Sequence, residues 1–334
     1  MQPRRPDAAF VLSRPLRDYD DSAFVWSNAG KSNPREIGVA RLARMLSGYD
    51  VVFYGESHGH SGVQRGEMQV LRALYERDPK WVLSLEQFER DVQPVVDDYL
   101  AGRKGEAALI GRGRAWSNYA TSYRPLLVFA ARHHLPVIAA EAPSWVIRCV
   151  GQAGIAILGR LTPLERSWVA GQINAGPGAY HDEYMSFLSS SAVHGGGPSA
   201  TDAPLQAALA AQRSFEAQAT RDDTMAESID RAWRDHPGYK VLHVTGSFHA
   251  AKFLGTVERL QARNPTLKIA VIDALEVEDP AAPAAPAAAL RQGTVLQLVY
   301  PTPDQFVEGE DPSGFIGAME AKHAAGKCKY TAPE

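Results

Sequence analysis

Two short segments that lie far apart in the chain share a glycine followed three positions later by a histidine. They are Gly55-Glu56-Ser57-His58 and Gly246-Ser247-Phe248-His249. Each follows an apolar run, residues 51–54 and 241–245, that predicts a buried strand. Ligands of an open α/β sheet bind at the carboxyl ends of its strands. Two imidazoles at that edge, with carboxylates nearby, therefore predict a metal or cofactor site.

Glu56 and His58 stand two residues apart, just beyond the first predicted strand. This offset places both side chains on one side if the extended conformation continues, and His60 continues the alternation. A carboxylate and an imidazole so placed can share a metal ion or act as an oriented base pair. The structural alternative is a polar turn, with which Gly59 and Gly62 agree.

Glu86 ends a third apolar run, residues 81–85, where a carboxylate is costly unless it is paired or solvated. It is a candidate site residue, with helix capping as the alternative. His249 is preferred to His243, which lies inside its strand and is predicted to be a core histidine with a satisfied hydrogen bond. In one hypothesis His58, Glu86 and His249 hold a divalent metal.

The role of Glu56 differs between two forms of this hypothesis. With a metal bound, Glu56 activates a water molecule. In a metal-free form, His58 is the general base and Glu56 orients it. Gln218, Arg221 and Asp222 are spaced to share one face of a predicted helix and are candidate supporting residues of the site. The alternative is that this face is simply charged and exposed to solvent.

Strands and helices alternate along most of the chain, which predicts an α/β fold with a mostly parallel central sheet and flanking helices. The predicted strands are 51–54, 81–85, 136–140, 241–245, 269–272 and an edge strand at 294–300. The predicted organisation is an irregular lead-in over 1–36, a single α/β domain over 37–300 with a helical insertion at about 144–235, and a polar tail over 301–334. Within these, a flexible loop is expected at 194–198, and the Pro/Ala repeat at 280–289 is expected to be a linker or an excursion.

The composition narrows the functional classes. The 334 residues are 45% hydrophobic and the net charge is -3, so nucleic-acid binding has no electrostatic support. No apolar run has the length of a membrane span. The spacing of Cys149 and Cys328 is not that of a metal-binding cysteine motif, and a disulfide between them is one possibility. The sequence as given shows no signal peptide, which predicts a cytoplasmic location; periplasmic or envelope attachment is the alternative if a leader was trimmed.

An ordered set of motifs resembles the ChaN-like haem-binding uptake proteins of the Tiki superfamily, to which TraB-like proteins and erythromycin esterases are related. The resemblance covers about residues 37–275. Its motifs are Tyr54-Gly55-Glu56-Ser57-His58, Leu85-Glu86-Gln87-Phe88-Glu89-Arg90-Asp91 with Gln93, Tyr99-Leu100-Ala101-Gly102, Tyr123-Arg124-Pro125-Leu126, Leu135-Pro136-Val137-Ile138-Ala139-Ala140, and Arg221-Asp222 with Met225-Ala226.

This resemblance implies that Glu56, His58, Glu86 and His249 form one site. In the superfamily such residues are proposed to serve metal-dependent peptidases or hydrolases, whereas the ChaN branch implies haem binding in iron acquisition, often by an envelope lipoprotein. The chain departs from the family in lacking a lipoprotein leader. It also has Glu141-Ala142-Pro143-Ser144 where an Asn and a basic residue are expected.

Three functions are therefore predicted in order of preference. The first is haem binding linked to iron uptake, with a Tyr or His on the iron; Tyr119, Tyr123, Tyr180 and Tyr184 are possible in principle, although single tyrosines are usually packing residues. The second is a hydrolase that uses a divalent metal on a small-molecule or peptide substrate. The third is a scaffold that binds a partner, and a homodimer is expected as an option in each case.

Overall fold

The structure is a computed structural model that describes residues 8–192, 203–307 and 328–330. The chain forms two compact units. Unit 1 comprises residues 1–141 and 225–302, and unit 2 comprises residues 142–224 and 303–334. The division falls inside one long helix, α10 (Ala203–Asp235), so each unit contains part of it.

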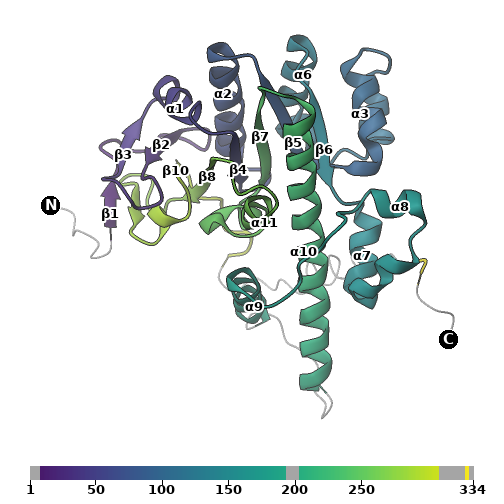
Figure 1. The fold of residues 1–334 in the computed structure, drawn as a ribbon. Helices are drawn as coiled ribbons and strands as arrows, with labels where there is room; N and C mark the ends of the chain where they lie inside the picture. Colours follow the sequence, from purple (N-terminus) through teal and green to yellow (C-terminus); the bar gives the residue numbers. More distant parts are fainter. Residues whose placement is uncertain (1–7, 193–202, 308–327, 331–334) are drawn as a thin grey trace. The chain divides into compact units, whose positions relative to one another are not determined.

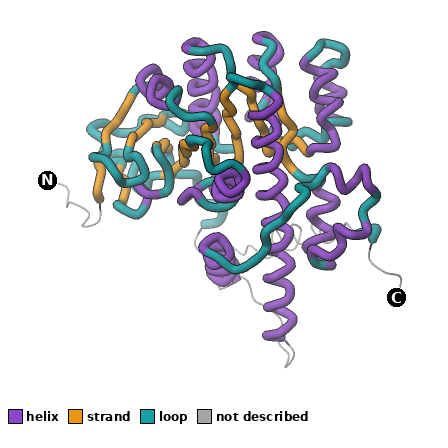
Figure 2. The backbone as a smooth tube through the Cα atoms, viewed as in Figure 1, coloured by secondary structure: helices purple, strands orange, loops and turns teal. Residues whose placement is uncertain are grey.

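Unit 1 is built on an eight-stranded sheet with the order β3-β2-β10-β8-β4-β7-β5-β6 (Figures 1 and 2). Six neighbouring strands, from β10 to β6, run parallel, while β2 pairs antiparallel with β10 on one side and with β3 on the other. This confirms the predicted α/β fold with a mostly parallel sheet. The strands are β2 (Ser22–Trp26), β3 (Arg35–Ile37), β4 (Val51–Glu56), β5 (Trp81–Glu89), β6 (Val137–Glu141), β7 (Lys240–Gly246), β8 (Ile269–Glu276) and β10 (Val295–Val299).

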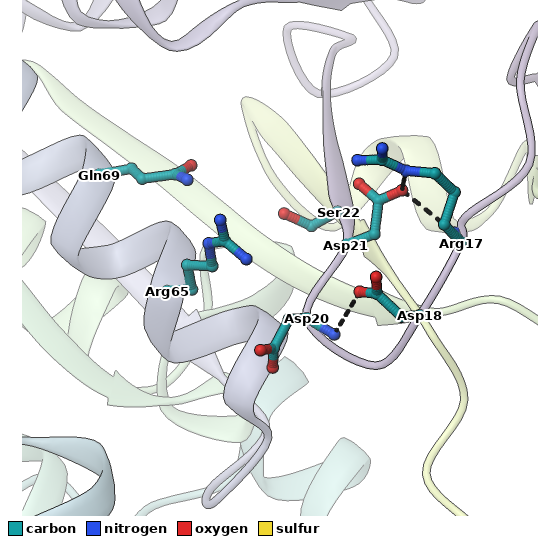
Figure 3. A pocket seen from close by; sticks show the side chains of 7 residues that line it. All are labelled: Arg17, Asp18, Asp20, Asp21, Ser22, Arg65 and Gln69. Carbon is teal, nitrogen blue, oxygen red and sulfur yellow. Dashed lines mark hydrogen bonds and ion pairs between the residues drawn. The ribbon is translucent and has the colours of Figure 1, made fainter.

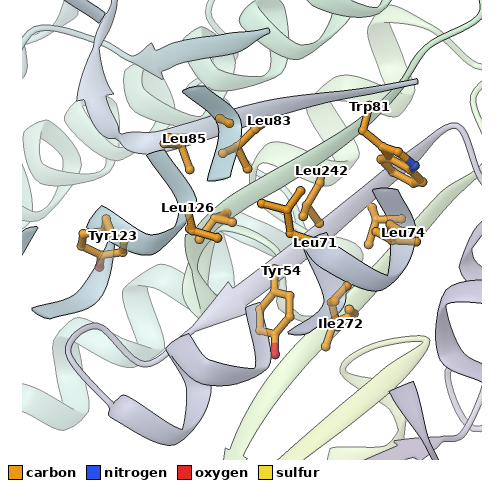
Figure 4. Close-up of a cluster of buried hydrophobic side chains, with 14 of the residues drawn as sticks. Tyr54, Leu71, Leu74, Trp81, Leu83, Leu85, Tyr123, Leu126, Leu242 and Ile272 are labelled. Carbon is orange, nitrogen blue, oxygen red and sulfur yellow. The ribbon is translucent and has the colours of Figure 1, made fainter. Parts of the chain in front are cut away.

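Helices cover both faces of this sheet, so its central strands are buried on both sides. The larger core, shown in Figure 4, packs Tyr54, Leu83 and Leu242 of the strands against Leu71 of α2 and Leu126 of α6. The opposite core includes residues of α10 and α11. The helices of unit 1 are α1 (Val39–Leu46), α2 (Ser61–Arg77), α3 (Gln93–Leu100), α4 (Glu106–Gly111), α5 (Tyr119–Ser122), α6 (Arg124–His133) and α11 (Thr256–Arg263).

The ends of the domain contain strands that the sequence did not predict. The expected irregular lead-in contains β2 and β3 of the sheet, as well as β1 (Ala8–Val11). The Pro/Ala repeat, expected to be a linker or an excursion, contains β9 (Ala284–Pro286), which pairs with β1. The expected edge strand is β10, which lies between β2 and β8 because β2 returns to cover it.

Unit 2 is helical, as predicted for the insertion. Its helices are α7 (Ser144–Ala153), α8 (Pro163–Ser167), α9 (Ala179–Ala192) and the first part of α10. A disulfide joins Cys149 of α7 to Cys328. The sequence had left this pairing as one possibility. Residues 194–198, predicted as a loop, lie outside the described residues, and so does most of the predicted tail.

Candidate functional site

The order of the strands brings the two glycine-histidine segments to one edge of the sheet. β7 lies between β4 and β5, and all three run in the same direction. Glu56, the last residue of β4, is in register with Gly246, the last residue of β7. The turns that carry His58 and His249 therefore leave the sheet side by side, with Glu86 near the end of the next strand.

The four predicted site residues converge at this edge. Nδ1 of His58 lies 2.8 Å from Oε1 of Glu56. Nε2 of His58 and Nε2 of His249 each lie 3.8 Å from Oε1 of Glu86. We call Glu56, His58, Glu86 and His249 the edge cluster; their proximity was predicted from the sequence, and their chemical roles stay predictions.

The two carboxylates approach His58 from opposite faces of the sheet. Side chains alternate along a strand, so Glu56 shares the face of Tyr54, which belongs to the larger core. Glu86 shares the face of Val82, which belongs to the opposite core. The imidazole of His58 therefore connects the two faces at the end of the sheet.

Glu56 is a buried hydrogen-bond acceptor that fixes the orientation of His58. Its Oε1 also accepts hydrogen bonds from the Tyr123 hydroxyl and from Nε2 of Gln87, both at 2.8 Å. With Glu56 as a carboxylate, its bond to His58 places the proton of His58 on Nδ1. Nε2 of a neutral His58 then carries the lone pair. The His58 side chain is 42% exposed, so that nitrogen belongs to an accessible residue.

Glu86 is held by the strand beside it. Its Oε2 accepts hydrogen bonds from the Thr245 hydroxyl and from the backbone N–H of Gly246, both at 2.6 Å. These two bonds leave Oε1 directed at the imidazoles of His58 and His249. A Cβ atom on Gly246 would stand 2.9 Å from Nε2 of His58, so a side chain at this position would displace the imidazole.

The donor set of His58, His249 and Glu86 suits a divalent metal chemically, but its spacing is wide. Two ligands of one tetrahedral zinc ion stand about 3.4 Å apart, given metal–ligand distances of about 2.0–2.1 Å. The nitrogen–oxygen distances here are 3.8 Å. Within the residues that the structure describes, no group of three or more His, Cys, Asp or Glu is arranged to hold a metal ion. A metal would therefore require a small contraction of the cluster.

A further acid at this sheet edge was missed by the sequence reasoning. Asp273 of β8 accepts a hydrogen bond from the Ser247 hydroxyl at 2.6 Å, beside the second turn. Burial raises the pKa of Asp273 to about 7, although the bond from Ser247 lowers it. Gly55 leaves room for this carboxyl, because a Cβ there would stand 2.9 Å from its Oδ1. The available signal was an acid that follows an apolar run, the same signal that identified Glu86.

The remaining predicted residues lie elsewhere or have structural roles. His243 is buried, its Nδ1 lies 2.9 Å from the Ser84 hydroxyl, and it packs edge-on against Phe53, which confirms the prediction of a core histidine. Gln218 and Asp222 both bind the hydroxyl of Tyr180 within unit 2. A role for Gln218, Arg221 and Asp222 beside the edge cluster stays a prediction.

A separate polar hollow of about 220 Å³ lies beside α2 in unit 1 (Figure 3). Within it, Arg17 pairs with Asp21, and the carboxylate of Asp18 accepts the backbone N–H of Asp20. None of the predicted site residues lines it. The lining residues are Arg17, Asp18, Asp20, Asp21, Ser22, Arg65 and Gln69.

Comparison with known proteins agrees with the motif set. The family model described as haem-binding uptake, Tiki superfamily, ChaN matches residues 42–260. The chain is similar to the structure of ChaN of Campylobacter jejuni, described with cofacial haem binding, with 16% identity and a TM-score of 0.60 over 86% of this chain and 100% of that one. This likeness shows the fold. No curated protein matches the chain.

Two other solved structures are more distant. A mutant of the erythromycin esterase EreC in its open conformation has 14% identity and a TM-score of 0.44 over 89% of this chain and 86% of that one. RRSP, a MARTX toxin effector domain from Vibrio vulnificus, has 16% identity and a TM-score of 0.39 over 82% of this chain and 41% of that one.

Proposed function

Because the chain belongs to the haem-binding uptake family of the Tiki superfamily, the ChaN family, we propose that it binds haem through His58 of the edge cluster and acts in haem or iron uptake. Family membership supports the ligand class. The binding of haem by the structurally similar Campylobacter jejuni protein supports it as well. The choice of His58 comes from the geometry of this chain.

One observation carries the assignment: His58 is an accessible imidazole whose Nδ1 is anchored on a carboxylate. Haem iron commonly takes a histidine nitrogen as its axial ligand. A hydrogen bond from the other ring nitrogen to a carboxylate orients such a ligand and makes it more basic. His58 meets both conditions, whereas the His249 side chain is only 5% exposed. Trp116 lies edge-on to His58 at 4.9 Å and offers apolar surface to a porphyrin.

Titration with haem tests this proposal. The purified chain should shift the Soret band relative to free haem, and His58→Ala should abolish that shift because it removes the axial ligand. His249→Ala should keep it, and His133→Gln, on the exposed end of α6, serves as the general histidine control. The proposal is contradicted if the wild-type chain leaves the spectrum of free haem unchanged, or if His58→Ala gives the same Soret shift as the wild type.

A metal-dependent hydrolase is the second candidate, and a different observation favours it. Nε2 of His58 and Nε2 of His249 approach the same oxygen of Glu86 at equal distances. Two imidazoles and one carboxylate would hold a divalent ion and leave a position for a water nucleophile. Glu56 is buried and its Oε1 has three hydrogen-bond partners, so its geometry favours orienting His58 over activating that water.

Metal analysis separates the two candidates on the same sample. The hydrolase predicts a bound divalent metal by mass spectrometry after dialysis, and metal-stimulated cleavage in ester and peptide panels. His58→Ala, His249→Ala and Glu86→Gln should each lose the metal, because each removes one ligand. A sample without metal and without stimulated cleavage would remove this candidate.

A further inference from the structure

A second hollow in unit 1, of about 520 Å³, is lined by the loop that joins β2 to β3 and by the segment that joins β9 to β10. Its volume is that of pockets which hold small organic ligands. It shares no residue with the edge cluster or with the hollow beside α2. We call it the cationic hollow. Its lining residues are Ala9, Gly30, Lys31, Ser32, Asn33, Pro34, Ala287, Leu290 and Arg291.

The charges of this hollow are all of one sign. Lys31 and Arg291 are its only charged lining residues, and both are exposed. Within the described chain, neither side chain forms a hydrogen bond or an ion pair. The hollow beside α2 differs, because Arg17 is paired there with Asp21 of the same lining. Two uncompensated cations at one hollow attract an anion.

The loop that carries Lys31 is fixed in place from below. The backbone N–H groups of Ser27, Asn28 and Ala29 donate to carbonyls of residues 293–294. The buried hydroxyl of Ser27 donates to the carbonyl of Leu290 at 2.8 Å. Asn28 and Ala29 have left-handed backbone, with φ of 51° and 56°. Such a conformation persists in residues other than glycine only where the surroundings determine it.

Gly30 sets the position of Arg291 against this loop. Gly30 has a φ of 77°, which glycine adopts without steric cost. A Cβ atom at this position would stand 3.0 Å from Cγ of Arg291, so the bare backbone gives the arginine stem its place. The cations of the hollow are therefore carried by two segments that are already joined, which lowers the cost of ordering them around a ligand.

We propose that the cationic hollow binds a small organic phosphate monoester, with Lys31 and Arg291 on the phosphate. A phosphate monoester carries nearly two negative charges at neutral pH, which two cations match. The guanidinium fork pairs with two phosphate oxygens and lysine acts as a point charge. Apolar lining from Pro34 and Leu290 contacts the organic body. The proposal goes beyond haem binding, because it uses no residue of the edge cluster.

Titration of the full chain with phenyl phosphate, followed by calorimetry, tests this site. The wild-type protein should bind the probe saturably. Lys31→Gln and Arg291→Gln should each weaken binding by at least about fivefold, because each removes a charged contact to the phosphate. Arg44→Gln, an exposed cation of α1 outside the hollow, should leave the affinity unchanged. His58→Ala should also bind normally, so the result is independent of haem binding.

Two comparisons sharpen the test. Benzoate carries one charge and should bind more weakly than phenyl phosphate, and neutral benzyl alcohol should not bind. Gly30→Asn keeps the left-handed backbone, which asparagine tolerates, but its Cβ displaces Arg291, so it should lose affinity while the circular dichroism spectrum stays the same. The proposal is overturned if phenyl phosphate does not bind the wild type, if the Lys31 and Arg291 variants bind it equally well, or if benzoate binds as tightly.

Discussion

At the scale of single residues, the sheet edge that carries the edge cluster is distinguished by its buried acids. Asp273 lies within β8 with one oxygen bound to Ser247 and the other, Oδ2, buried without a hydrogen bond in the described chain. An acid in such a place is more stable when it is neutral. Its protonation therefore couples the stability of unit 1 to pH.

The stability of the wild-type protein should fall as pH rises from about 4 to about 7. The pKa of Asp273 is about 7 in the folded chain and 3.8 ordinarily, so over this range the folded state binds more protons than the unfolded state. A shift of this size corresponds to a loss on the order of 4 kcal/mol. Urea unfolding at about pH 4 and about pH 8 measures it.

The variant Asp273→Asn should remove most of this pH dependence, because the amide stays neutral and keeps the shape of the carboxyl. Asp235→Asn, at an exposed position, is the matched control. Equal pH dependence in the wild type and Asp273→Asn would show that another group is responsible.

The core of the site could be predicted from residue types, but its supporting residues could not. Glu56, His58, Glu86 and His249 are polar residues at or just after strand ends, and that pattern is visible in a sequence. Their partners come from distant elements: Tyr123 lies in the loop before α6, and it was considered only as a packing residue or an iron ligand. Such contacts depend on how helices pack, which spacing alone does not determine.

At the scale of elements, α2 closes one face of the sheet. Its start is fixed by His60, whose Nδ1 accepts the N–H of Val63 and whose Nε2 donates to the carbonyl of Tyr300 at 2.8 Å. Tyr19 stacks on the same ring at 4.2 Å. His60, which the sequence placed in line with Glu56 and His58, is thus a helix cap rather than a member of the cluster.

Replacing His60 with alanine should destabilise unit 1 by about 1–2 kcal/mol, because the first turn of α2 loses its side-chain acceptor and the partly buried carbonyl of Tyr300 loses its donor. His60→Asn should recover part of this loss, since asparagine is a good N-cap. Urea denaturation monitored by circular dichroism measures both. A midpoint equal to that of the wild type in His60→Ala would exclude a capping role.

The parallel strands were predicted well because each is an apolar run followed by a helical pattern. β2, β3 and β9 were missed for two reasons. Their runs are short, and the turn-forming residues around them, such as those at 27–34, resemble an irregular segment. β10 was predicted to be an edge strand because β2 was missed. Once β2 pairs with it, β10 lies inside the sheet.

At the scale of the whole molecule, the covalent link in unit 2 ties two distant parts of the sequence. Cys149 and Cys328 are 179 residues apart. Around the link, Arg160 donates to the carbonyl of Tyr330 at 2.8 Å, and Lys329 pairs with Glu165 at 2.5 Å. These contacts bring residues 328–330 against the helices of unit 2.

Removal of this link should lower the stability of unit 2 by about 2–5 kcal/mol, because a closed loop restricts the unfolded chain. Thermal unfolding with and without a reductant measures the effect, which should appear as a lower transition temperature in the reduced sample. The double variant Cys149→Ser with Cys328→Ser should already melt at the lower temperature and show no further response to reductant. A wild-type transition that reductant leaves in place would argue against the pairing.

The pairing of the two cysteines also has a consequence for the place where the protein works. Thiols in the cytosol are kept reduced by glutathione and thioredoxin, whereas sulfur–sulfur bonds persist in the periplasm and outside the cell. A chain that secures its last described residues through such a bond is suited to an oxidising compartment. We therefore propose the periplasm or the cell envelope as its location, and thiol-specific labelling of the protein in its native cells should find both cysteines blocked.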